Sequence, residues 1–160
     1  MLQSHSILLA YTEILIPNQM LRHIFVIGSL LFLPVMDSAA QLVVITNPKS
    51  GVSSLTRDEV VNIFLGRFRQ LPSGISAQPA DLPAAQPERA QFYRLLVNKD
   101  LAEINSYWAR LIFSGRTVPP RQTLSNEDLL SFISRTPGAI GYLEKARVDT
   151  RVKVVLDLVE

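Results

Sequence analysis

Three helix-start motifs, separated by apolar segments, constrain the fold of this chain more than any other feature of its sequence. In each motif a capping side chain is followed three residues later by an acid: Thr56 and Glu59, Asp100 and Glu103, Ser125 and Asp128. The first side chain of such a pair caps the helix, and the acid reaches back to the backbone amide of the cap. The chain therefore has three well-marked helix starts.

Apolar neighbours support the first and third of these helix starts. Leu55 and Val60 flank the first motif, and Leu124 and Leu129 flank the third. Each pair has the spacing of a hydrophobic staple, so all four side chains are expected to pack inward. Gly66 follows the first helix and predicts a left-handed end to it.

The helix that follows Asp100 has the clearest amphipathic pattern. Its apolar positions recur at intervals of three and four residues up to Gly115 and predict one buried stripe: Leu101, Ile104, Trp108, Leu111 and Ile112. Trp108 and Phe113 are also candidates for a ligand platform, but core packing is the preferred interpretation of such a stripe.

Apolar, β-branched runs alternate with these helices. Strands are predicted at residues 41–47, 75–80, 139–143 and 152–158. Gly141, inside the third of them, indicates a close approach of another element to the backbone. Helices that alternate with strands predict an α/β domain with its helices packed on a small mixed sheet, spanning residues 41–160.

Residues 1–40 have the pattern of an export signal. An apolar run at 24–36, with Ser29 as its one polar residue, follows Arg22 and precedes Ala40, after which cleavage is expected. Met20 lies directly before this pattern and is the expected true start. An uncleaved membrane anchor is the alternative interpretation. The signal predicts a secreted, periplasmic protein.

Residue composition narrows the possible chemistry. The chain has no cysteine, and both of its histidines, His5 and His23, lie in the leader. Residues 41–160 therefore have neither Ser-His nor Cys-His pairs, nor the common zinc ligands, and we expect no enzyme activity, no metal and no cofactor. A net charge of +2 is too small to indicate nucleic-acid binding.

Three segments in order resemble the phosphate-binding subunits of bacterial ABC transporters, which have the type II periplasmic binding protein fold. They are VVITNPKSGVSSLT (43–56), LTRDEVVNIFLGR (55–67) and RTPGAIGYL (135–143). The resemblance implies a periplasmic binding protein type II-like domain, phosphate or a related oxyanion as ligand, and an inner-membrane ABC transporter as partner. It covers about one lobe of that family's usual two, so the site is expected to be open unless a second chain, such as another copy, completes it.

The helix predicted at 87–97 departs from the family. By position, the family's Gly-Ser-Gly-Thr phosphate loop corresponds here to Ala85, Gln86, Pro87 and Glu88. Pro87 has no NH group to donate, and Glu88 places a negative charge in the first turn, where it competes with an anion. The phosphate loop is therefore degenerate.

Four residues remain as ligand-binding candidates. Arg89 offers a planar fork for an oxyanion, Gln86 a further donor, and Ser53 and Ser54 hydroxyls in the loop after the first strand. The alternative is that Arg89 pairs with Glu88, Asp81 or solvent and that the serines serve the turn. Two functional hypotheses follow: a phosphate or oxyanion receptor for a transporter, or a non-catalytic periplasmic interaction or sensing module that has lost anion binding.

Overall fold

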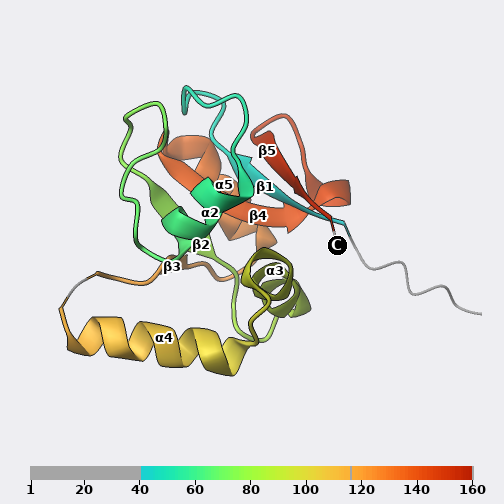
Figure 1. The fold of residues 1–160 in the computed structure, drawn as a ribbon. Coiled ribbons are helices and arrows are strands. Elements are labelled where there is room, and N and C mark those ends of the chain that lie inside the picture. Colours follow the sequence, from blue (N-terminus) through green and yellow to red (C-terminus); the bar gives the residue numbers. More distant parts are fainter. Residues whose placement is uncertain (1–40, 116, 160) are drawn as a thin grey trace, which may run out of the picture. The chain divides into compact units, whose positions relative to one another are not determined.

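The structure is a computed structural model and describes residues 41–115 and 117–159. These residues form a five-stranded sheet with helices on both faces (Figure 1). The leader predicted at 1–40 lies outside the described residues. The strands are β1 (Leu42–Thr46), β2 (Gln78–Asp81), β3 (Arg121–Gln122), β4 (Ala139–Glu144) and β5 (Lys153–Leu158). The helices are α2 (Arg57–Phe64), α3 (Pro87–Val97), α4 (Leu101–Phe113), α5 (Asn126–Arg135) and the short 3-10 turn η1 (Lys145–Arg147).

The sheet is mixed, as the sequence predicts. Its strand order is β3-β2-β4-β1-β5. β1 lies between β4 and β5 and is antiparallel to both, with Val44 opposite Tyr142 on one side and Leu156 on the other. β2 runs parallel to both β4 and β3. Every residue of β1 is buried, which explains its continuous run of apolar side chains.

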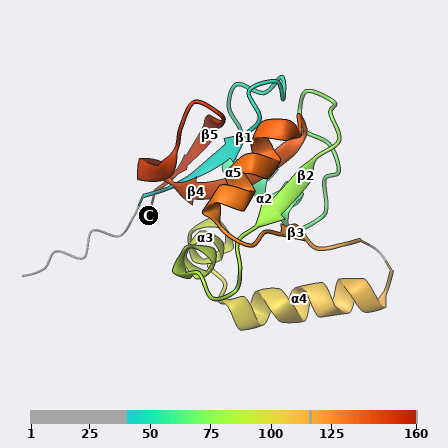
Figure 2. The same cartoon turned by 180° about the vertical axis from the view of Figure 1, so that it is seen from behind.

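Helices α2 and α5 cover opposite faces of the sheet (Figures 1 and 2). On the α2 side, the core is aromatic: Phe92 of α3 stacks on Tyr142 of β4 with ring centroids 3.8 Å apart, and Phe64 of α2 meets Phe92 edge-on. On the other face, α5 lies so close to β4 that a Cβ atom added to Gly141 would come within 2.8 Å of Ile133 and Leu129. The close approach predicted at Gly141 is confirmed.

The first two helix-start motifs form as predicted. Thr56 and Glu59 make a reciprocal capping box at the start of α2, and Asp100 and Glu103 make another at the start of α4. Gly66 has a φ of 70° just after α2, the left-handed conformation expected of it.

The third motif forms a cap but not the predicted staple. Ser125 Oγ accepts from the amide of Asp128, while the Asp128 carboxylate accepts from the amide of Leu124. The bond to Leu124 fixes the chain before α5 with that side chain turned outward, so Leu124 is 87% exposed although Leu129 is buried. The prediction of an inward-facing Leu124 is wrong.

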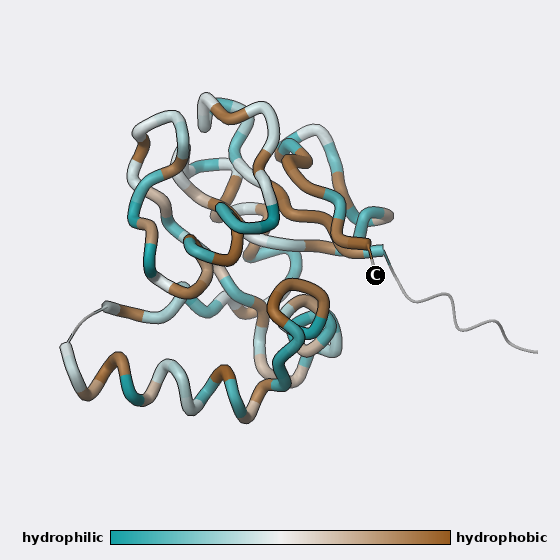
Figure 3. The backbone as a smooth tube through the Cα atoms, in the orientation of Figure 1, coloured by the Kyte–Doolittle hydropathy of each residue, from teal (hydrophilic) through white to brown (hydrophobic). Residues whose placement is uncertain are grey.

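The buried stripe predicted on α4 is correct in its first half. Ile104 and Trp108 are buried, whereas Ile112 is 55% and Phe113 93% exposed. In Figure 3, apolar stretches recur along α4 to its C-terminal end, and Figure 1 shows that end extending away from the sheet. Periodicity predicts which face of the helix is apolar, but the body of the protein covers that face for only part of its length.

The strand predicted at 75–80 lies slightly later, at β2, because the preceding residues form a bridged turn between Gln70 and Ser76. None of the described helices is both long and apolar enough to cross a membrane.

Candidate functional site

A buried cluster of ionisable side chains lies where β2 ends. Asp81 is the last residue of β2 and is 3% exposed. Tyr142 reaches it from the neighbouring strand β4, and Arg89 and Tyr93 reach it from the first two turns of α3, the helix that follows β2. Arg89 and Tyr93 are four residues apart, so they lie on one face of that helix.

The Asp81 carboxylate accepts three side-chain hydrogen bonds. Nε of Arg89 lies 2.9 Å from Oδ2, the hydroxyl of Tyr93 lies 3.0 Å from the same oxygen, and the hydroxyl of Tyr142 donates to Oδ1. Tyr142 in turn accepts from the amide of Leu82 at 3.2 Å. A carboxylate buried with three donors, one of them a cation, is compensated internally, which is what a buried charge requires.

The main chain of the same residue is fixed from the other side. The amide and hydroxyl of Thr123, just after β3, both donate to the carbonyl oxygen of Asp81, at 2.9 and 3.0 Å. Side chain and main chain of Asp81 therefore join β2, β3, β4 and α3 at one point.

The charges in this cluster stabilise one another. Burial alone lowers the pKa of Arg89, but the Coulomb attraction of Asp81 and the hydrogen bond to it reverse that effect, so the pKa is raised. Burial, followed by the negative charge of Asp81, raises the pKa of Tyr93 and of Tyr142 above the ordinary tyrosine value. Both phenols therefore remain protonated donors at neutral pH.

The start of α3 is built differently from a phosphate-binding helix start. Gln86 occupies the cap position without any side-chain capping bond, and its Oε1 is buried without a hydrogen-bond partner in the described part of the chain. Pro87 is the first helical residue, and Glu88 is 8% exposed. The carboxylate of Glu88 thus occupies the first turn, where the helix dipole favours negative charge, in competition with any anionic ligand.

The structure brings two of the four candidate residues together. Gln86 and Arg89 share the first turn of α3, where the amide of Arg89 donates to the carbonyl of Gln86 at 3.2 Å. Arg89 pairs with Asp81, one of the alternatives that the sequence left open. The role of these two residues in binding a ligand stays a prediction.

Ser53 and Ser54 lie elsewhere. Both are exposed, in the loop that ends where the amide of Leu55 donates to the carbonyl of Val155 on β5. Two strands, β1 and β4, separate β5 from β2, and each step between strands is about 4.8 Å. The serine hydroxyls are therefore not part of the group around Arg89.

Sequence reasoning missed the central role of Asp81 and its contacts with Tyr93, Tyr142 and Thr123. The spacing of Arg89 and Tyr93 on one helical face was the available signal. Tyr142 is 61 residues from Asp81 and Thr123 is 42, so no local pattern indicates these contacts.

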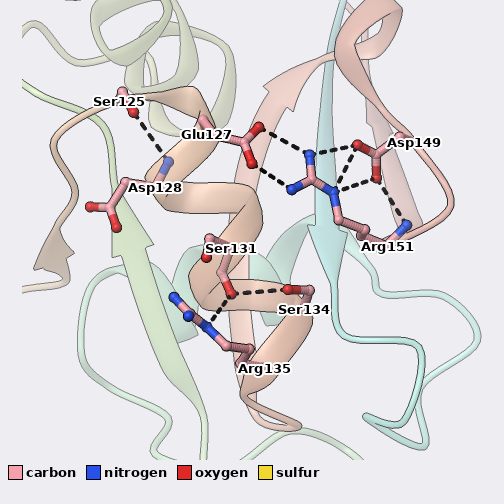
Figure 4. A network of polar contacts seen from close by, with 8 residues as sticks. All are labelled: Ser125, Glu127, Asp128, Ser131, Ser134, Arg135, Asp149 and Arg151. Carbon is pink, nitrogen blue, oxygen red and sulfur yellow. Dashed lines mark hydrogen bonds and ion pairs between the residues drawn. The ribbon is translucent and has the colours of Figure 1, made fainter.

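A second polar network, on the surface, contrasts with this cluster (Figure 4). Arg151 donates to both carboxylate oxygens of Glu127, at the start of α5, and to Asp149, just before it in the chain. Two carboxylates thus share one guanidinium, and both are well exposed. This network ties α5 to the loop before β5.

Comparison with known proteins supports the fold. No family model and no curated protein match the sequence. The similar solved structures include an ABC-type phosphate transport receptor from Vibrio cholerae, with a TM-score of 0.58 and 17% identity, covering 72% of this chain and 45% of that chain. A putative phosphate ABC transporter substrate-binding protein with bound phosphate from Clostridium perfringens has a TM-score of 0.57 and 18% identity, covering 72% of this chain and 44% of that chain. PstS from Borrelia burgdorferi has a TM-score of 0.54 and 16% identity, covering 72% of this chain and 46% of that chain.

The likeness shows the fold that the resemblance implied, an α/β domain of the periplasmic binding protein type. The chain spans less than half the length of each of these three structures.

Proposed function

We propose that this protein is an exported, non-catalytic binding protein of the solute-binding type, related in fold to phosphate receptors but with an impaired phosphate loop. One observation carries the proposal: the single arginine at the start of α3 is already paired with a buried carboxylate, Asp81. A ligand of this protein therefore meets an arginine whose charge is largely compensated.

Charge accounting weighs against free phosphate at this helix start. Two like charges about 4 Å apart repel by roughly 4 kcal/mol at an effective dielectric of 20. One charge-assisted hydrogen bond contributes about 1.5 to 3 kcal/mol. Because Glu88 adds a negative charge and Pro87 removes a donor, the dianion of phosphate gains less from this helix start than it loses. Weak binding of phosphate or a related oxyanion is the expected limit.

The fold supports a receptor role in a transport system, with an inner-membrane ABC transporter as the proposed partner. The three phosphate-receptor structures share this α/β arrangement. The described residues account for about one lobe of such a receptor, and we propose that a further lobe, a second protein or a second copy closes the binding face.

Isothermal titration at low salt tests the proposal, with phosphate, sulfate and methylphosphonate as ligands. We expect at most weak binding, with dissociation constants in the millimolar range, and we expect Arg89→Ala to abolish any binding that occurs. Arg94→Ala is the matched control, because Arg94 is an exposed arginine on the same helix. Micromolar phosphate binding that survives Arg89→Ala in a folded protein overturns the proposal.

A second candidate function is a protein-interaction or sensing module. It is favoured by large apolar side chains that the described part of the chain leaves exposed: Phe113 at 93%, Leu124 at 87% and Val118 at 79%. Affinity capture from envelope extracts with the wild-type protein and with Phe113→Ser tests it. If the wild type and Phe113→Ser recover a partner or a second copy equally well, that binding does not use the end of α4. The exposed Phe113 then no longer supports an interaction module.

A further inference from the structure

Large apolar side chains are exposed around the C-terminal end of α4, which extends away from the sheet (Figure 1). The exposed fractions are 93% for Phe113, 55% for Ile112, 79% for Val118 in the following loop and 50% for Phe68 just after α2. We call these four side chains the α4 tip. Apolar side chains that gather on a protein surface commonly mark an interaction site.

A groove brings three members of the α4 tip together from separate segments. It has a volume of about 520 Å³ and is lined by Phe68, Ile112 and Val118, with Arg69 beside them. Phe113 follows Ile112 in the helix, where successive side chains point about 100° apart. The side chain of Phe113 therefore projects away from the groove, and apolar surface extends around more than one side of the tip.

The two segments that form the tip carry positive charge and no negative charge. Residues 60–80 and 104–126 contain neither aspartate nor glutamate. Arg67, Arg69 and Arg110 are exposed within them. Neither Arg67 nor Arg110 forms an ion pair within the described ranges. The α4 tip is thus both apolar and cationic.

One carboxylate, that of Glu59, lies on the other side of Phe68, in a hollow that Arg67 and Arg69 also line. The amide and the hydroxyl of Thr56 both donate to this carboxylate, at 2.7 and 2.9 Å. Its charge is engaged by the cap of α2 and matched by two arginines. The surroundings of the tip therefore remain cationic.

We propose that the α4 tip binds reversibly to the surface of a bilayer that contains anionic phospholipid. Phe113, Ile112 and Val118 enter the boundary between the headgroups and the acyl chains, and the neighbouring arginines meet the lipid phosphates. The inference goes beyond the proposed function, since it concerns neither a solute nor a transporter.

The spread of apolar side chains around the tip favours a bilayer over a protein partner. A protein segment that fills the groove covers Phe68, Ile112 and Val118 and leaves Phe113 in water. A bilayer surrounds an inserted protrusion and removes all sides of it from water at once. Its phosphates also complement the arginines of both segments, whereas a lipid without net charge gains only the apolar contact.

Co-sedimentation with vesicles tests the proposal, with phosphatidylcholine alone and with phosphatidylcholine mixed with phosphatidylglycerol. The full chain is used for every variant, so residues 1–40 contribute equally to each. We expect tighter binding to the mixed vesicles, and we expect added salt to reduce that preference, because the charges lie at the surface.

Substitutions then assign the contact. Phe113→Ser is expected to weaken binding about tenfold or more, because it removes one large side chain from the acyl boundary. The matched control is Val159→Ser, which also removes an exposed apolar side chain. Val159 is 59% exposed and follows β5, at the opposite edge of the sheet from β3, the strand to which the loop after α4 leads. This control should bind as the wild type does.

The charge is tested separately. Arg110→Gln is expected to weaken binding to the mixed vesicles about fivefold and to leave binding to phosphatidylcholine unchanged. Arg94→Gln is its control, because Arg94 is an exposed arginine on α3 rather than at the tip. Equal effects of the two substitutions contradict the role given to Arg110.

Insertion is measured with Phe113→Trp, which places an indole at the tip, and with Val159→Trp as its control. Brominated acyl chains quench an indole that enters the bilayer. We expect quenching in Phe113→Trp beyond that of the wild type, whose sole tryptophan is the buried Trp108, and no such increase in Val159→Trp.

Three results overturn the proposal: equal binding to both kinds of vesicle, equal binding of Phe113→Ser and Val159→Ser, or an indole at position 113 that brominated lipid does not quench. A protein captured through Phe113 by a chain that ignores vesicles also overturns it, and leaves the interaction module standing. None of these results bears on anion binding near Arg89, so the receptor function is tested independently.

Discussion

Nε of Arg89 lies 2.9 Å from Oδ2 of Asp81, and both side chains are less than a tenth exposed. The pair ties the start of α3 to the end of β2. It also decides how the protein can treat an anion, because the arginine that sequence alone offers as a ligand clamp is structural first. Any ligand contact made by Arg89 is made in addition to this ion pair.

Removing one member of the pair is expected to destabilise the protein strongly. Asp81→Asn leaves the guanidinium of Arg89 buried without a counter-charge, and Arg89→Met does the same to the carboxylate of Asp81. Each variant is expected to lose about 3 to 5 kcal/mol in the free energy of unfolding. The double variant is expected to lose less than the sum of the two, because neither charge is then stranded. Urea unfolding followed by circular dichroism measures all three.

The matched control for that cycle is the surface pair of Lys145 and Asp157, whose side chains are 52% and 47% exposed. Lys145→Ala is expected to cost about 1 kcal/mol or less. If Asp81→Asn costs no more than Lys145→Ala, the buried pair does not have the role described.

The hydroxyl of Tyr142 is expected to stabilise the fold in addition to the stacking of its ring on α3. Tyr142→Phe keeps the stacking on Phe92 but removes a donor to Asp81 and an acceptor for the Leu82 amide. We expect a loss of about 1 to 3 kcal/mol in the free energy of unfolding. Chemical denaturation measures it, and a neutral result contradicts the hydrogen-bond network around Asp81.

Alkaline pH is expected to destabilise the fold through Tyr93 and Tyr142. Both have a pKa raised above the ordinary value of 10.0, so the folded state holds protons that the unfolded state releases. This contribution is fully present below pH 10.0 and is lost as the pH rises above it. Near-ultraviolet absorbance during a base titration should show two tyrosines that ionise on unfolding, one fewer in each Tyr→Phe variant.

Acid pH is expected to act through the network of Figure 4. The hydrogen bonds from Arg151 lower the pKa of Glu127 and of Asp149 below their ordinary values of 4.5 and 3.8. Their contribution is present above those ordinary values and is lost as the pH falls through the lowered ones. Arg151→Ala should therefore flatten the acid side of the stability profile, measured as melting temperature against pH. Because the network is exposed, added salt should reduce the difference between variant and wild type.

Two glycines at close contacts are expected to differ in their tolerance of a methyl group. A Cβ atom at Gly141 meets side-chain carbons of Ile133 and Leu129 at 2.8 Å, whereas one at Gly138 meets the backbone oxygen of Ser76 at 2.0 Å. Side chains can shift more easily than backbone, so Gly141→Ala should cost about 1 to 3 kcal/mol and Gly138→Ala more. Thermal unfolding of both variants decides the order, and a reversed order contradicts the packing described here.

Local signals in the sequence predicted the elements that depend on local physics. The capping boxes at Thr56 and Asp100, the helix from Pro87 to Val97 and the strand after Gln41 all form where the sequence places them. Each is governed by hydrogen bonds or side-chain contacts within a few residues, so its signal lies within one short window. The pairing of Arg89 with Asp81, eight residues away, was foreseen as one alternative among several.

The tertiary structure decided what those elements do together. Asp81 becomes the centre of a network because Tyr142, 61 residues away, lies on the adjacent strand. Ile112 is exposed because the described body of the protein covers the apolar face of α4 for only part of its length, whereas Leu124 is turned outward where its amide donates to Asp128. Spacing along the chain predicts which side chains share one face of a helix or strand. Contacts between distant segments decide what packs against that face.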